Sequence, residues 1–124
     1  MMTHPSTPTV TVTEAAARLD GAGQPRPILV DVRERNEFAL LRVPGSVLLP
    51  LSTLSTTYDQ LPTDRPLLLL CAVGGRSARA TDFLRANGYT DAVNVAGGIT
   101  AWNAAGLGIR TGTPEADEGA LPED

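Results

Sequence analysis

The 124-residue chain lacks or nearly lacks several residue types on which common kinds of site depend. It has one cysteine, Cys71, so it can form no disulfide within the chain and no cysteine-rich zinc site. Its one histidine, His4, stands among Pro and Thr near the N-terminus, where we expect a solvent-exposed residue and not the partner of a Cys–His pair. We therefore expect Cys71 to act without histidine, and we expect neither a metal nor a cofactor.

Lysine is absent, and all ten basic residues are arginines, whose planar guanidinium groups suit oxyanions. Up to Arg110 these arginines are balanced by nine acidic residues. The residues that follow carry no base and five acids, namely Glu115, Asp117, Glu118, Glu123 and Asp124. The net charge of −4 thus belongs to an acidic tail on a nearly neutral body. Since no basic cluster resembles a phosphate-binding surface, we expect no nucleic-acid partner.

Long hydrophobic runs are also absent. The longest, Leu67–Val73, has seven residues, far fewer than a membrane span requires. The first eight residues have neither the basic region nor the apolar region of a signal peptide, so we expect a cytoplasmic protein without a membrane partner. Length and composition predict one domain over residues 10–110, after a flexible N-terminus (1–9) and before a disordered acidic tail (111–124).

Strand-like and helix-like segments alternate along the chain. Apolar, β-rich segments predict strands at 10–12, 28–32, 46–49, 66–70 and 92–95. Helices are expected at 13–19, with Thr13 as the cap, and at 34–41, 51–61, 77–87 and 99–105. Strands that alternate with helices predict right-handed crossovers. The fold class is therefore α/β, a five-stranded parallel sheet with helices on both faces.

One segment combines several residues with chemical potential. Cys71 directly follows the buried strand at 66–70, which brings it to the carboxyl edge of the sheet, where ligands bind in open α/β folds. Gly74-Gly75 allows a tight turn with inward N–H groups, and Ser77 is expected to begin a helix whose dipole favours an anion. These features predict a thiol pKa below the usual value of about 8.5. Arg76 adds a cation for an anionic substrate.

Each of these residues also has a simpler interpretation when it is considered alone. A single buried cysteine is often just a small apolar side chain. Arg76 would then be an exposed surface cation, and Gly74-Gly75 an ordinary turn. Their combined spacing at the end of a strand favours a nucleophile that works without a general base.

The chain resembles the single-domain rhodaneses, a family of sulfurtransferases, from Val12 to Gly106. Four motifs carry the resemblance in the same order: Asp31-Val32-Arg33 with Glu37-Phe38, then Pro44-Gly45-Ser46, then Cys71-x-x-Gly74-x-Arg76-Ser77, and finally Gly97-Gly98-Ile99-x-Ala101-Trp102. The fold that the resemblance implies, a five-stranded parallel sheet flanked by helices, agrees with the alternating pattern.

The resemblance implies a two-step transfer of a sulfane sulfur. Cys71 takes the sulfur from thiosulfate or a persulfide donor as a persulfide and passes it to a thiol or cyanide, and a sulfur-accepting protein is another candidate acceptor. The expected substrate-binding residues form the loop after Cys71, namely Ala72, Val73, Gly74, Gly75, Arg76 and Ser77. Asp31 and Arg33 are expected to brace neighbouring loops through ion pairs.

Two other functions stay open at this point. Phosphatases and arsenate reductases have related loops, but their arginine comes six positions after the cysteine, whereas Arg76 comes five after Cys71. A non-catalytic sulfur-carrier or interaction module is the second alternative. Family loops often carry Arg or Lys directly after the cysteine, and here Ala72-Val73 is neutral, which leaves room for a bulkier or less charged donor.

Overall fold

The computed structural model describes residues 6–122. Its core is a parallel sheet with the strand order β1-β6-β5-β2-β4. The strands are β1 (Thr9–Val10), β2 (Ile28–Asp31), β4 (Val47–Leu48), β5 (Leu67–Leu70) and β6 (Ala92–Val95). The predicted α/β class with a five-stranded parallel sheet is therefore confirmed.

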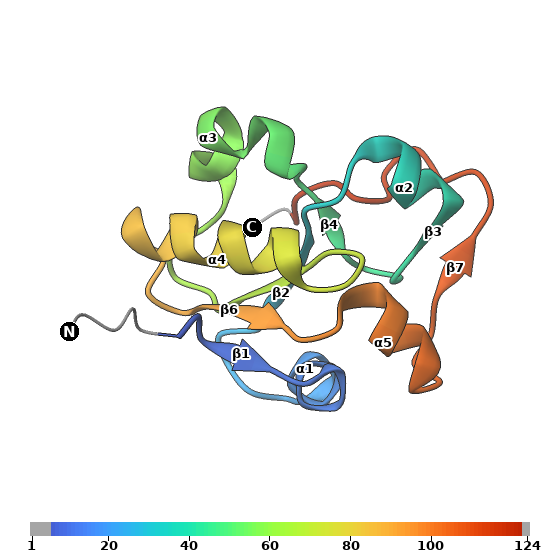
Figure 1. Ribbon diagram of the computed structural model, residues 1–124, viewed down its shortest axis with the longest axis horizontal. Coiled ribbons are helices and arrows are strands. Elements are labelled where there is room, and N and C mark those ends of the chain that lie inside the picture. The colour runs from blue at the N-terminus through green and yellow to red at the C-terminus, as the bar shows by residue number, and fades with distance from the viewer. Residues whose placement is uncertain (1–5, 123–124) are drawn as a thin grey trace.

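Helices cover both faces of this sheet (Figure 1). One face carries α1 (Val12–Asp20) and α5 (Gly98–Ala104). The other carries α4 (Gly75–Ala86) and a helical segment formed by η1 (Leu51–Thr53), α3 (Leu54–Thr57) and η2 (Tyr58–Gln60). The short α2 (Arg35–Leu40) follows β2. Among residues 6–122, no helix has the length and apolar character needed to cross a membrane.

The alternation of side chains along β5 decides which face receives the cysteine. Leu68 and Leu70 pack in the cluster beneath α1 and α5, whereas Leu67, Leu69 and Cys71 belong to the cluster beneath α4. Successive side chains of a strand point to opposite faces. Cys71 therefore faces the beginning of α4.

Several predicted elements differ from the structure in their bounds or regularity. The first strand ends at Val10 rather than at Val12, and Thr11, not Thr13, caps the following helix. Thr11 Oγ1 accepts the Glu14 N–H at 3.1 Å, and the Glu14 carboxylate accepts the Thr11 N–H, so a capping box starts the helix early. The helix expected over 51–61 is broken into three short pieces. The Thr56 and Thr57 hydroxyls donate to the Thr53 carbonyl, which competes with a regular helix.

The prediction of a disordered tail is wrong for residues 111–122. A second sheet forms where β7 (Arg110–Thr111) pairs antiparallel with β3 (Leu41–Arg42). The buried Arg42 guanidinium binds Glu118 at 2.6 Å, and the Gly119 carbonyl accepts the Leu48 N–H at 2.9 Å. The tail therefore covers the edge of β4 and neutralises the buried Arg42. Both contacts depend on residues outside the tail, so the composition of the tail alone does not predict them.

The prediction of a flexible N-terminus is likewise wrong for residues 7–9. Thr7 donates a hydrogen bond to Asp82, Pro8 accepts one from the Asn94 N–H, and Thr9 lies in β1. Residues 1–5, which include His4, and residues 123–124 lie outside the described part of the chain.

Candidate active site

Cys71 lies directly after β5, and only 1% of its surface is exposed. Its Sγ atom accepts a hydrogen bond from the Gly74 N–H at 3.0 Å, and Ser77 Oγ lies 3.2 Å away. Gly74 has a φ of 108°, a left-handed conformation that side chains rarely adopt, and it turns the chain into α4. That helix begins at Gly75, two residues before the predicted start at Ser77. Its first turn is therefore directed at the sulfur.

The surroundings favour the thiolate form of Cys71. Burial raises the thiol pKa, but hydrogen bonds from the Ser77 hydroxyl and from the N–H groups of Ser77, Gly74 and Val73 lower it. The hydrogen bonds outweigh burial, so the pKa lies below its ordinary value. A thiol with a lowered pKa can serve as a nucleophile without a general base.

The beginning of α5 holds the loop from outside. The Ile99 N–H donates to the Cys71 carbonyl at 2.8 Å, and the Thr100 N–H donates to the Ala72 carbonyl at 3.1 Å. Gly98 lies so close that a Cβ atom there would collide with both carbonyl oxygens. Because these carbonyls are bound to α5, the loop can present N–H groups to the sulfur.

Arg76 is paired with a carboxylate. Its two terminal nitrogens bind the Glu37 oxygens at 2.7 and 2.8 Å. The side chains of Arg76 and Glu37 are 31% and 30% exposed. The hydrogen bond from Arg76 lowers the pKa of Glu37 to about 2, despite the opposing effect of burial. The cation that the sequence predicts for an anionic substrate therefore has its charge balanced by α2. Val73, an apolar residue of the same loop, is 69% exposed.

Asp31 and Arg33 form a buried ion pair at the end of β2, at 2.7 Å. Arg33 also donates to the carbonyls of Glu37 and Leu41, at 3.4 and 2.8 Å. These hydrogen bonds run to α2 and to the residue after it, and not to Cys71. The pair therefore positions the helix that supplies Glu37.

Three residues around the loop were not predicted as parts of a site. Glu37 and Gly98 are parts of the family motifs, but the motifs do not predict the contacts described above. Asn94 carries no motif signal, although its side-chain oxygen lies 2.6 Å from Ser77 Oγ. One signal could have found it, because it is the polar residue in the apolar strand Ala92–Val95, where an uncompensated amide would be costly.

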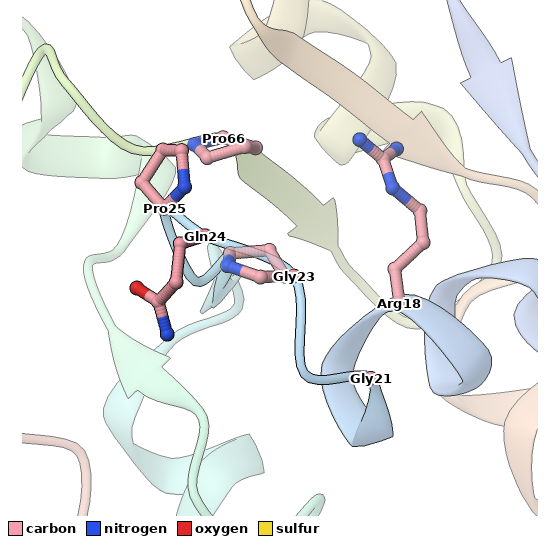
Figure 2. A pocket seen from close by; sticks show the side chains of 7 residues that line it. Arg18, Gly21, Gly23, Gln24, Pro25 and Pro66 are labelled. Atoms are coloured by element: carbon pink, nitrogen blue, oxygen red, sulfur yellow. The ribbon is translucent and has the colours of Figure 1, made fainter.

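The hollow in Figure 2 has a volume of about 300 Å³ and lies away from this loop. It is lined by Arg18, Gly21, Gly23, Gln24, Pro25, Pro27 and Pro66. Pro27 and Pro66 directly precede β2 and β5, so the hollow lies at the amino ends of these strands, opposite Cys71. None of its lining side chains is a nucleophile or a carboxylic acid. Among residues 6–122, no group of three or more His, Cys, Asp or Glu side chains could hold a metal ion.

Comparison with known proteins agrees with the fold. Residues 11–105 match the family described as "Rhodanese-like domain". The uncharacterized protein YqhL of Bacillus subtilis is 40% identical over 92 residues, which cover 74% of this chain and 71% of that protein. The human thiosulfate:glutathione sulfurtransferase is 33% identical over 109 residues, or 77% and 92% of the two chains.

A solved structure gives the same result in three dimensions. The crystal structure of a rhodanese-like domain protein from Staphylococcus aureus superimposes with a TM-score of 0.72 at 35% identity. The match covers 84% of this chain and 99% of that one. The resemblance predicted from the four motifs is therefore confirmed.

Proposed function

The chain belongs to the rhodanese-like domain family, which includes sulfurtransferases, and we propose on this basis that it transfers a sulfane sulfur through a persulfide on Cys71. The observation that carries the proposal is the Cys71 sulfur held by hydrogen-bond donors at the carboxyl edge of the sheet, with the Gly74 N–H at 3.0 Å. A thiolate stabilised by such hydrogen-bond donors attacks sulfur without needing a base.

In the first step, the Cys71 thiolate attacks the outer sulfur of the donor. A new S–S bond forms, the donor's S–S bond breaks, and its electron pair leaves with sulfite or with a thiolate. The persulfide is an anion, and N–H groups of residues 72–77 would stabilise it as they stabilise the thiolate.

In the second step, an acceptor thiolate or cyanide attacks the outer sulfur of the persulfide. The Cys71–S bond breaks, and Cys71 leaves as the thiolate with which the cycle began. The donor product leaves before the acceptor reacts, so we expect ping-pong kinetics.

The charges around the loop bear on the choice of donor. Arg76 is balanced by Glu37, and Ala72 and Val73 are neutral, so the rim exerts little net attraction on the thiosulfate dianion. This supports a donor whose binding does not depend on its charge, such as a bulkier organic persulfide, over thiosulfate. The human relative is named for thiosulfate and glutathione, which supports a thiol as one substrate and keeps thiosulfate as the other candidate donor.

A sulfur-carrier role is the second candidate, and the exposed Val73 favours it. An apolar residue at 69% exposure, two positions after Cys71, offers a contact to a protein acceptor. A phosphatase role has less support, because the Arg76 nitrogens that would hold an oxyanion already bind Glu37. We place the reaction in the cytoplasm, where reduced thiols are maintained.

Mass spectrometry after incubation with thiosulfate or glutathione persulfide tests the proposal. We expect wild-type protein to gain one sulfur atom and to lose it again when a thiol is added, whereas Cys71→Ser gains none. A persulfide that leaves only with a partner protein would favour the carrier. An unchanged mass with both donors would contradict the proposal.

A further inference from the structure

The Ser77 hydroxyl has one proton and two neighbours that can accept it. Asn94 Oδ1 lies 2.6 Å from Ser77 Oγ, and Cys71 Sγ lies 3.2 Å from it. When the proton points at Asn94, the lone pairs of Ser77 face the sulfur. That arrangement suits a thiol, which donates its S–H to Ser77, but it gives no hydrogen bond to a thiolate.

The Asn94 carboxamide can remove this conflict. It presents an oxygen acceptor or, after a half-turn about its last bond, an N–H₂ donor at nearly the same place. When Nδ2 donates to Ser77 Oγ, the serine proton is free to point at Cys71. Only the end of the Asn94 side chain needs to move, because its backbone is held in β6 between β1 and β5 and donates to Pro8 at 2.8 Å.

We propose that Asn94 is a positioning residue for sulfur transfer, whose carboxamide turns to direct the Ser77 proton at Cys71 when the sulfur is anionic. In the thiol state, S–H donates to Ser77 and Ser77 donates to Asn94 Oδ1. On ionisation the thiol proton goes to solvent, Asn94 Nδ2 donates to Ser77, and Ser77 donates to the thiolate. The importance of this exchange for turnover rests on the proposed function, since Cys71 is a thiolate at the start and end of that cycle.

Other charges near the sulfur must be separated from this effect. Arg76 of α4 and Glu37 of α2 form one pair at the rim, and the buried Asp31–Arg33 pair ends β2. Within the described residues, β5, β6 and α5 contribute no charged side chain. Asn94 is therefore the group on β6 through which the sheet can influence the Cys71 proton.

The test measures thiol ionisation and needs no sulfur donor. Because Cys71 is the chain's one cysteine, the pH dependence of alkylation by iodoacetamide reports its pKa alone. In Asn94→Asp the side chain only accepts, so it should hold the Ser77 proton and raise the alkylation midpoint by about one pH unit. Asn103→Asp, which adds the same charge at an exposed position of α5, is the matched control and should leave the midpoint unchanged.

The double variant separates the hydrogen bond from the added charge. If Asn94 acts through Ser77, Asn94→Asp should shift the midpoint much less in a Ser77→Ala background than in the wild type. Equal shifts in both backgrounds, or no shift in Asn94→Asp, would overturn the proposal. Wild-type sulfur transfer would be unaffected by that result, so the two proposals fail separately.

A measurement on the wild-type protein covers the case in which the variants do not fold. With ¹⁵N-labelled asparagine, the side-chain N–H₂ signals of Asn94 should titrate with the same midpoint as Cys71 alkylation. Asn36, Asn87 and Asn103 provide internal references. An Asn94 signal that does not move through this titration would overturn the proposal.

Discussion

The carboxylate of Glu37 in α2 binds both terminal nitrogens of Arg76 in α4, at 2.7 and 2.8 Å. The two residues are 39 positions apart in the sequence. Their pairing joins the reactive loop to α2 and balances the cation next to Cys71.

Replacement of Glu37 by Gln should change the preference between donors. The amide keeps the shape and a hydrogen bond but releases the Arg76 charge, so kcat/KM for thiosulfate should rise by roughly 3–10-fold at low salt. A donor without net charge should change little. Steady-state kinetics with both donors measures this, with Glu34→Gln as the control that removes a carboxylate from the N-terminus of the same helix. A similar loss of activity with both donors would mean that the pair shapes the loop instead.

The ion pairs of Glu37 and Glu118 should make stability depend on pH below neutrality. Hydrogen bonds from Arg76 and Arg42 lower the pKa of these two carboxyls to about 2, from the ordinary 4.5. A carboxyl with a lowered folded-state pKa stabilises the protein fully above its unfolded pKa and loses that effect as the pH falls toward the folded value.

Urea unfolding between about pH 5 and pH 2 should therefore show a steep loss of stability. Glu118→Gln should be less stable than the wild type at neutral pH and should lose less on acidification. Asp117→Asn removes a neighbouring carboxylate and should keep the wild-type slope. A Glu118→Gln variant with an unchanged slope would contradict the role of this pair.

Truncation after Arg110 should destabilise the protein. It removes Glu118 from Arg42 and uncovers the edge of β4, so we expect the Tm to fall by roughly 5–10 °C. Differential scanning calorimetry of the truncated and full chains measures this. Glu115→Gln, which keeps the tail and the Arg42 contact, is the control. An unchanged Tm would restore the sequence-based expectation of a free tail.

Gly98→Ala should impair the reactive loop specifically. The new Cβ would collide with the carbonyl oxygens of Cys71 and Ala72, and the φ of +58° disfavours a side chain at this position. Displacement of the loop should reduce sulfur transfer by about a hundredfold. Gly23→Ala, whose added methyl group meets open space, should keep wild-type activity. Wild-type activity in Gly98→Ala would show that α5 does not position the loop.

The sequence by itself determined the strand and helix alternation, the sheet class and the position of Cys71 at the end of a buried strand. These features are local, because a run such as Leu67–Leu70 and the Gly74-Gly75 turn set the course of their own backbone. The four motifs also identified the family. Where local signals competed, as at Thr11 and Thr13, the boundary was misplaced by two residues.

Only the tertiary structure decided which polar groups meet. Glu37 reaches Arg76, Asn94 reaches Ser77 across 17 positions, and Glu118 reaches Arg42 across 76. Hydrophobic periodicity shows which face of an element is buried, but it does not specify which donor and acceptor from distant segments become neighbours. That pairing follows from how the helices and the tail pack on the sheet. Here it balances the charge of Arg76, places Asn94 beside Ser77 and orders the tail.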